Sequence, residues 1–408
     1  MVFSNFPTYK QIPGRPNITV SPLGVANGYI TNGGADYGPD TPGTETVGLQ
    51  EAINFCAQNK LSLRVIPGTY NIGANSLTLP KGVGLDIRSF APNDSASGSP
   101  TVVISYSGTS GYAIDSAGAS TTADYTSNAK GYVDGIAVYS TASGIRVSNL
   151  VYDFGRIEVY GNGTAGGIGF DTYPTGNGAE SKIDFLLSNG FATGARIAQD
   201  HVSILHYESA LVASGGTVLR CGLGGSVGGN VGLTIGYWHH YVGSGGVPAY
   251  GIDFTTTGSE CHSLSVGNWL WEGTAPTSAF CHSTSYAGTI LSIGMLDNDF
   301  GKAVSLGLLE IPTNYYGVSV RNIGAVTPMG FGVTTPAVPT SGTAIQNTNA
   351  FTVRIYVLTA SGVTYTITDP YGNVSSSISA SAGSEITLDP GASITPTYTT
   401  LTWKWYGE

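Results

Sequence analysis

Hydrophobic and polar positions follow a helical period in one short stretch and a period of two in much of the remaining chain. The residues with the spacing of one helix face are Leu49, Ala52, Ile53, Cys56 and Ala57. Thr44 or Thr46 is placed to cap this helix, and Glu45 lies near its positive N-terminal end. The pattern therefore predicts one short amphipathic helix near the N-terminus.

Alternating strands are predicted directly after this helix. Leu61, Leu63 and Val65 alternate as in a half-buried strand that ends at Pro67-Gly68. Short alternating runs then recur between turns rich in Gly, Asn and Ser, for example at 83–87, 102–104, 144–147, 202–205, 233–235, 251–254, 264–266 and 290–293. No comparable helix returns after Gly68. We therefore expect the helix to close the open end of a β-solenoid.

One local repeat suggests the length of a solenoid turn. Cys261-His262-Ser263 recurs as Cys281-His282-Ser283. An interval of this size suits one coil, which stacks each residue on its equivalent about 4.8 Å away. Cys261 and Cys281 would then form a disulfide between adjacent coils, or remain as stacked, buried thiols. Zinc is disfavoured because neighbouring Cys and His side chains of one strand point to opposite faces. We predict no metal and no cofactor.

The chain divides into four segments by composition. Residues 1–32 contain four prolines and no clear period, which is typical of an extended arm, and residues 33–332 contain the helix and the solenoid strands. Residues 333–349 have the Pro, Thr, Ser and Gly content of a linker. Phe351, Val353, Ile355 and Val357 then alternate, and turns at 369–373 and 389–391 separate further strands. Residues 350–408 are therefore predicted as a small antiparallel, β-sandwich-like domain.

The helix and its surroundings resemble the N-terminal segment of the pectate-lyase-like superfamily. The residues that carry the resemblance are Gly34-Ala35-Asp36-Tyr37-Gly38, Gly48-Leu49-Gln50-Glu51-Ala52-Ile53 and Val65-Ile66-Pro67-Gly68-Thr69-Tyr70. The Asp-Asp-Thr that usually precedes the helix is replaced by residues 39–44 (PDTPGT). The resemblance implies an all-β fold, a right-handed parallel β-helix with an N-terminal capping helix. The family includes polysaccharide lyases, glycoside hydrolases and viral tail spikes and fibres.

Composition narrows the classes of function. Charged residues make up 10% of the 408 residues and Gly numbers 59, so uncharged polar residues must cover much of the surface. The net charge of −10 argues against nucleic acid as a partner, because phosphate binding needs a surplus of Lys and Arg. The 16 Lys and Arg residues do not cluster along the sequence. The first twenty residues lack the apolar core of a signal peptide, and no apolar run approaches about 18 residues, so we expect no membrane insertion.

Two groups of acids are candidates for chemistry. Asp297 and Asp299 share one strand face, as paired acids do in an inverting glycosidase, whose carboxyl groups stand about 6.5–9.5 Å apart. The Asn-Thr-Asp, Gly-His-Gly and Arg-x-Lys elements of β-helical hydrolases are absent beside them, and a solvated turn is the alternative. The second group consists of Asp153, Glu158, Asp171 and Asp184. These acids predict a groove or a calcium site, and the alternative is a polar exterior.

Aromatic residues concentrate in two stretches, at 237–241 (YWHHY) and 269–272 (WLWE). Aromatic rings stack on the faces of sugars and supply contact area at a low entropic cost. The residues that we predict to bind a glycan are Tyr237, Trp238, Trp269 and Trp271. The alternatives for these rings are filling of the core and contact between subunits.

The functional hypothesis from the sequence is a structural attachment protein of a virion. We expect an extracellular spike or fibre on the virion surface that binds a host-surface polysaccharide or glycoprotein as a homotrimer. The N-terminal arm would contact other virion proteins. A polysaccharide hydrolase or lyase is the main alternative, because a fold does not determine its function. A cell-surface adhesive or structural protein is the third.

Overall fold

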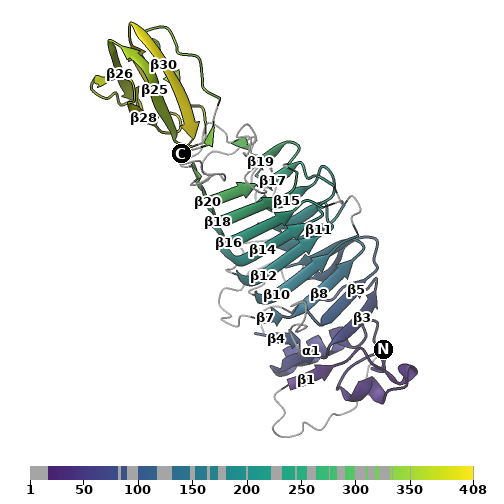
Figure 1. Ribbon diagram of the computed structural model, residues 1–408. Coiled ribbons are helices and arrows are strands. Elements are labelled where there is room, and N and C mark those ends of the chain that lie inside the picture. Colours follow the sequence, from purple (N-terminus) through teal and green to yellow (C-terminus); the bar gives the residue numbers. More distant parts are fainter. Residues whose placement is uncertain are drawn as a thin grey trace.

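The computed structural model describes residues 17–80, 84–89, 100–116, 131–147, 152–162, 166–172, 181–198, 201–221, 232–243, 246–254, 263–274, 276–282, 290–298, 309–310, 318–320, 331–332, 334–349 and 351–407. The molecule is elongated (Figure 1). Its first strands and its α-helix lie at one end, and the C-terminal strands lie at the other. Short 3-10 turns, η1 (Val25–Asn27) and η2 (Thr31–Gly34), follow the first strand.

The largest sheet has 14 strands, and we call it sheet A. It contains β1 (Asn17–Val20), β2 (Ser62–Val65), β3 (Gly68–Gly73), β4 (Asp86–Ser89), β5 (Val102–Tyr106), β7 (Gly131–Asp134), β8 (Ile136–Ser140), β10 (Tyr152–Tyr160), β12 (Ser181–Asn189), β14 (Val202–Ala210), β16 (Leu233–Tyr241), β18 (Ser263–Glu272), β20 (Ile290–Asn298) and β22 (Val318–Val320). β10 pairs with both β7 and β8, so it and the long strands of nine or ten residues that follow it continue two shorter rows of strands.

A second sheet of eight strands, sheet B, accompanies sheet A. It contains β6 (Tyr112–Asp115), β9 (Ser143–Arg146), β11 (Ile168–Thr172), β13 (Thr193–Ile197), β15 (Thr217–Cys221), β17 (Tyr250–Asp253), β19 (Ala279–His282) and β21 (Leu309–Glu310). From β9 to β22 the chain visits the two sheets in turn, and all their strand pairs are parallel. The described residues are thus compatible with an all-β parallel solenoid.

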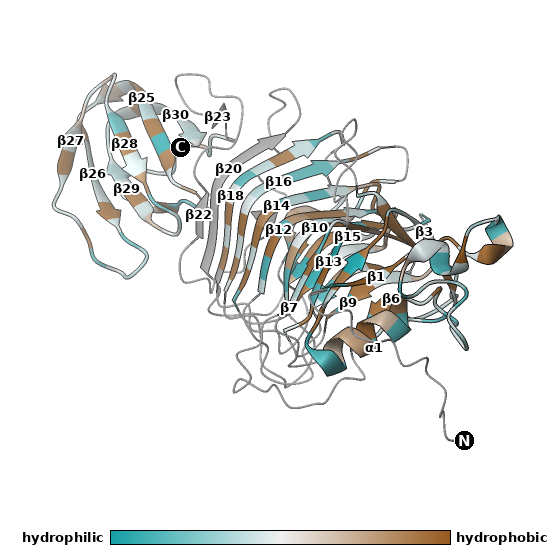
Figure 2. Ribbon diagram, turned by 90° about the horizontal axis from the view of Figure 1, so that it is seen from below, coloured by the Kyte–Doolittle hydropathy of each residue, from teal (hydrophilic) through white to brown (hydrophobic). Residues whose placement is uncertain are grey.

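The predicted helix is present as α1 (Leu49–Asn59), which lies beside the first strands of sheet A (Figure 2). Its buried residues match the prediction: Leu49, Ala52, Ile53, Cys56 and Ala57. The N-cap is Gly48 and not a threonine. Thr46 nevertheless accepts a hydrogen bond from the backbone N–H of Gln50 at 3.1 Å, which satisfies one exposed donor of the first turn. Leu49 and Ile53 line a small apolar cavity with Leu63 of β2 and Val133 of β7.

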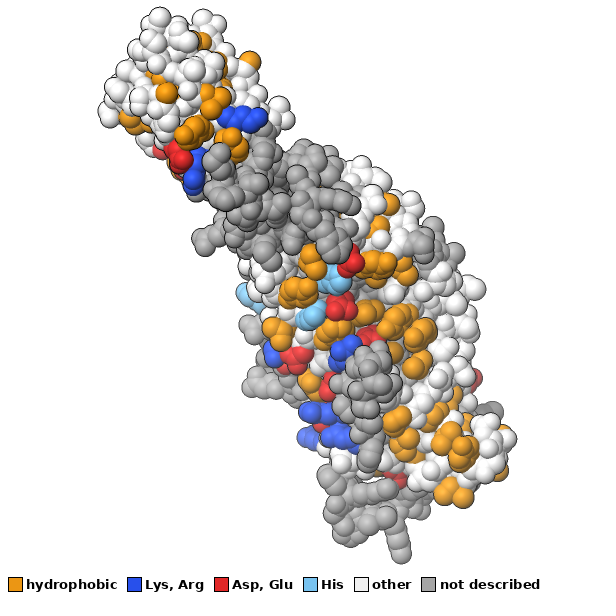
Figure 3. Space-filling view, in the orientation of Figure 1, with side chains coloured by type: hydrophobic (Ala, Val, Ile, Leu, Met, Phe, Trp, Pro, Cys, Tyr) orange, Lys and Arg blue, Asp and Glu red, His pale blue; other side chains and the backbone are white. Residues whose placement is uncertain are grey.

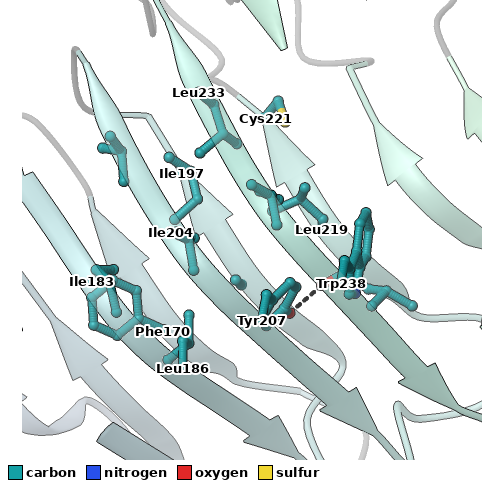
Figure 4. Packing of buried hydrophobic residues seen from close by; sticks show 14 of the residues in the cluster. Phe170, Ile183, Leu186, Ile197, Ile204, Tyr207, Leu219, Cys221, Leu233 and Trp238 are labelled. Atoms are coloured by element: carbon teal, nitrogen blue, oxygen red, sulfur yellow. Dashed lines mark hydrogen bonds between the residues drawn. The ribbon is translucent and has the colours of Figure 1, made fainter. Parts of the chain in front are cut away.

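Inward-facing side chains of consecutive strands stack along the molecule. Figure 4 shows Leu186, Tyr207 and Trp238, which are register partners on β12, β14 and β16. Trp269 of β18 continues this row, and its ring stacks on Trp238 with the two centroids 4.3 Å apart. All four side chains are fully buried. Stacked rings of this kind provide a large buried area at each rung.

Glycines of sheet B make room for the rings that sheet A sends into the core. A Cβ atom added to Gly251 of β17 would lie 2.9 Å from the ring of Trp269. A Cβ atom on Gly194 of β13 would lie 2.8 Å from the hydroxyl of Tyr207. Both distances are shorter than ordinary carbon contacts, and the backbone oxygens of Phe280 and Val218 would lie closer still, at 2.7 and 2.6 Å, so a larger residue at either position would force a shift. Part of the high glycine content therefore has a packing reason besides tight turns.

The Cys-His-Ser repeat does not mark consecutive turns. Ser263 belongs to sheet A and pairs with Ile290, whereas Cys281 belongs to sheet B and pairs with Ile252. The prediction failed because the number of residues per turn varies: Ile183 pairs with Ile204, and Ile204 with Ile235. Cys281 is a buried free thiol, which favours the buried-thiol alternative. Cys261 lies outside the described residues, so the disulfide stays a prediction.

Two antiparallel sheets of four strands form the C-terminal part. One contains β23 (Phe331–Gly332), β25 (Val353–Ser361), β28 (Glu385–Leu388) and β30 (Thr400–Gly407), and the other contains β24 (Ile345–Gln346), β26 (Val363–Thr368), β27 (Ile378–Ala380) and β29 (Ser393–Thr397). The segment 333–349, predicted as a linker, supplies β24 to one of these sheets. The carbonyl of Pro336 in the same segment accepts a hydrogen bond from the indole of Trp403 at 3.0 Å. This segment therefore packs with the C-terminal strands.

We expect Gly251→Ala to lower the free energy of unfolding by about 1–3 kcal/mol, because the added methyl group overpacks the core against Trp269 and the backbone oxygen of Phe280. Urea titration of the purified chain measures the change. The exposed Ser278→Ala is the matched control and should have a small effect. Combining Gly251→Ala with Trp269→Leu should cost less than the sum of the two single changes. Strict additivity would refute the packing argument.

Candidate functional site

The alternation of inward and outward side chains changes phase once in β12, β14, β16 and β18. In β16, Ile235 and Trp238 are buried, while Gly236 is exposed and Tyr237 is half-buried. The ladder to β18 likewise passes from the pair Ile235–Val266 to the pair Tyr237–Asn268 without pairing the glycines between them. Two consecutive residues of each strand therefore face outward here.

This phase change corrects the predicted glycan-binding residues. Trp238, Trp269 and Trp271 are 0% exposed and cannot contact a ligand at the surface. The indole N–H of Trp238 donates to the hydroxyl of Ser209 at 3.0 Å, and that of Trp271 donates to the carbonyl of Thr274 at 2.9 Å. These three rings fill the core, which was the stated alternative, and Tyr237 alone of the four predicted residues faces outward.

A row of rings that the sequence analysis did not identify runs along the outer side of sheet A. Phe185, His206 and Tyr237 are register partners on β12, β14 and β16. The centroids of Phe185 and His206 lie 5.0 Å apart, and those of His206 and Tyr237 lie 4.8 Å apart. The guanidinium of Arg156 on β10 lies over Phe185, 4.0 Å from the ring centre. We call Arg156, Phe185, His206 and Tyr237 the ring row.

Acids and imidazoles flank the ring row on the same strands. Glu158 lies between Arg156, at 2.6 Å, and the hydroxyl of Tyr160, which donates to it at 2.6 Å. The imidazole of His206 lies 3.3 Å from Glu208. Burial lowers the pKa of His206 below its ordinary value, and the nearby Glu208 carboxylate opposes that effect in part. The surroundings of His206 therefore favour its neutral imidazole.

A second imidazole–carboxylate pair lies near the same row. His239 of β16 and Glu272 of β18 approach to 3.1 Å between Nε2 and Oε2. Figure 3 shows acidic, basic and imidazole side chains gathered over this part of sheet A. Rings that supply flat apolar area next to paired carboxylates and imidazoles can bind a polyhydroxylated ligand, because hydroxyl groups donate to carboxylates while ring faces pack on C–H groups.

The predicted catalytic pair is only partly placed. Asp297 occupies a position in β20 that pairs with Leu270, which itself pairs with His239. The backbone of Asp297 is therefore in register with Glu208 and His239 on the preceding strands. Asp299 lies outside the described residues, so catalysis by this pair stays a prediction.

The four other predicted acids do not come together. Asp153, Glu158 and Asp184 are in sheet A, whereas Asp171 is in sheet B and pairs with Arg196 at 2.6 Å. Asp184 pairs with Lys182, and Asp153 accepts a hydrogen bond from the backbone of Lys182. Within the described part of the chain, no three His, Cys, Asp or Glu residues are placed to hold a metal ion. The single groove or calcium site predicted from these acids is therefore not assembled.

No family model matches the chain. No curated protein matches it either. In the described part of the chain, no helix has the length and hydrophobicity needed to cross a membrane.

The core behind the ring row contains a buried imidazole with a consequence for acid stability. His240 is 0% exposed, its ring lies 4.2 Å from that of Trp271, and its Nδ1 lies 2.8 Å from the hydroxyl of Ser209. Burial lowers the pKa of His240 to about 3, and the neighbouring His239 adds to the effect. The folded chain therefore keeps this imidazole neutral at pH values where the unfolded chain protonates it.

We expect the free energy of unfolding to fall as the pH drops from about 6.5 to about 3, because the unfolded state binds the proton first. The loss attributable to His240 is at most about 5 kcal/mol, at about 1.36 kcal/mol per pKa unit. His240→Asn should reduce this pH slope in urea titrations. The control is His201→Asn, at an exposed position whose positive φ suits Asn. An unchanged slope in His240→Asn would show that other groups control acid unfolding.

Proposed function

We propose that this chain is an attachment protein on the surface of a virion, a spike or fibre that binds a host-surface glycan or glycoprotein. The proposal extends to the fold: a right-handed parallel β-helix of the pectate-lyase-like type with α1 as its N-terminal cap. The parallel ladders of sheets A and B support the solenoid. The burial of Leu49 and Ile53 against β2 and β7 supports the capping role of α1.

The ring row is the observation that carries the binding function. Phe185, His206 and Tyr237 present half-buried rings on three consecutive strands, at the spacing that the backbone ladder imposes. These three side chains are partly buried and already ordered. They therefore lose little side-chain entropy when a ligand binds, which favours affinity. Carboxylates and imidazoles beside them supply acceptors for hydroxyl groups. A glycan of the host surface combines both kinds of group.

The engagement of Glu158 within the protein argues against a catalytic role for this carboxylate. Glu158 is 1% exposed and contacts both Arg156 and Tyr160, so its oxygens are engaged within the protein. Glu208 and Glu272 lie beside imidazoles but are 36% and 39% exposed, so their oxygens stay accessible to hydroxyl groups of a ligand. A general acid or base must reach the proton that it transfers, and a buried, doubly bonded carboxylate does not. Polysaccharide cleavage therefore remains the alternative, with Asp297 and Asp299 as its predicted residues.

Binding is tested with fluorescently labelled protein on purified envelopes of candidate host cells and on a panel of soluble polysaccharides. Tyr237→Ala and Phe185→Ala should each weaken the binding roughly tenfold, because an aromatic contact at the centre of an interface is lost. Tyr371→Ala, which removes a ring that is 90% exposed in the C-terminal part, should leave the affinity unchanged. If Tyr237→Ala and Phe185→Ala bind with the affinity of the wild type, as the control does, the ring row has no role in binding.

The same polysaccharide panel discriminates the enzymatic alternative. A binding protein leaves the polymer length unchanged during prolonged incubation. If the wild type releases new reducing or unsaturated ends and Asp297→Asn does not, the function is depolymerisation and not attachment.

We further propose that the functional form is a homotrimer that contacts other virion proteins through residues 1–32. Light scattering of the full chain should give the mass of three chains. The measurement is repeated at several concentrations, because association depends on concentration. A mass of one chain throughout that range would refute the trimer.

A further inference from the structure

A row of charged side chains lies at one register position on sheet B, on the opposite sheet from the ring row. It runs along β6 to β19 and consists of Asp115, Arg146, Asp171, Arg196, Arg220, Asp253 and His282. We call it the charged row. The sequence shows no cluster of cations, yet the parallel register places Arg196 and Arg220 side by side.

Two of the three arginines are held by close carboxylates. Arg146 donates to Asp115 from Nε at 2.9 Å and from Nη2 at 2.7 Å. Arg196 donates to Asp171 in the same two-pronged way, at 2.9 and 2.6 Å. These distances are those of strong charge-assisted hydrogen bonds. Both guanidinium groups are therefore oriented by partners within the protein.

Arg220 is held less closely than the other two. Among the described residues it contacts Asp253, with Nε 3.3 Å from Oδ2. Asp253 is shared, because the imidazole of His282 lies 3.5 Å from its other oxygen. The side chain of Arg220 is 34% exposed, compared with 19% for Arg196. The outer edge of the Arg220 guanidinium is thus accessible to a ligand.

Arg196 and Arg220 oppose each other directly in the ladder, about 4.8 Å apart at the backbone. Like charges in this position destabilise a sheet. Asp171 and Asp253 already offset part of this repulsion, and an anion outside the two guanidinium groups would accept from the N–H donors that these carboxylates leave over. Arginine is also the side chain best suited to this task, because its planar fork of N–H donors matches the oxygens of carboxylate, sulfate and phosphate groups.

We propose that Arg220, with Arg196 beside it, forms a binding site for an oxyanion on sheet B. The ligand chemistry is a planar carboxylate or a tetrahedral sulfate or phosphate, carried by an acidic sugar or free in solution. Arg220 supplies the accessible donors, Asp171 fixes the orientation of Arg196, and Asp253 fixes that of Arg220. This site is independent of the ring row and of the function proposed for it.

Isothermal calorimetry on the full chain at constant ionic strength tests the site, with galacturonate, sulfate and phosphate as probes and galactose as the neutral reference. Calorimetry is preferred to thermal shifts because sulfate stabilises folded proteins in general. We expect saturable binding of the oxyanions and none of galactose. Arg220→Gln should weaken the binding roughly tenfold to a hundredfold, as for loss of a charged hydrogen bond.

The matched control is Arg354→Gln, because Arg354 also pairs with a carboxylate at 3.5 Å and is 36% exposed. It should bind as the wild type does. Tighter binding of galacturonate than of sulfate identifies an acidic sugar as the ligand, and equal binding identifies a free oxyanion; both support the site. Absence of saturable binding, or equal affinity of wild type and Arg220→Gln, overturns it. If Arg220→Gln does not fold, Arg220→Lys replaces it, and an undiminished affinity for galacturonate in that variant likewise overturns the site.

Discussion

The parallel backbone ladder is the constraint on which the rest of this structure depends. It holds consecutive strands about 4.8 Å apart, so every side chain meets the same neighbours above and below it. Inside, this rule stacks Tyr207, Trp238 and Trp269 into one column. Outside, it arranges the ring row on sheet A and the charged row on sheet B. One backbone geometry therefore produces the core and both candidate binding surfaces.

Ring stacking in the core imposes a size rule across the two sheets. At two rungs, a wide side chain of sheet A leaves little room on the strand of sheet B that faces it. A methyl group at Gly194 would crowd the hydroxyl of Tyr207, and one at Gly251 would crowd the ring of Trp269, besides a backbone oxygen of the neighbouring strand in each case. A lost ring would leave a cavity, and an added methyl group would force a shift. Glycine and tryptophan are thus complementary parts of one packing solution.

Local patterns in the sequence predicted the elements well but not their phase. The spacing of Leu49 to Ala57 predicted α1, and the alternation from Phe351 predicted β25, because both signals are complete within a few residues. Strict alternation from Leu233 and Ile235 would send Tyr237 inward and Trp238 outward, the reverse of what the structure has. The extra outward residue at Gly236 causes the reversal, and a glycine in an alternating run is the only sequence signal of it.

The two outer rows could not be predicted from the sequence, because their members are brought together by register alone. Phe185, His206 and Tyr237 are separated by unequal stretches of chain, and so are the arginines of the charged row. No fixed period connects them, and the Cys-His-Ser repeat indicated a false one. Because these side chains stand on strands and not on loops, the ladder fixes the spacing between them. A substitution in either row therefore changes the chemistry of one rung while the positions of its neighbours stay the same. Single variants can thus test the two rows independently.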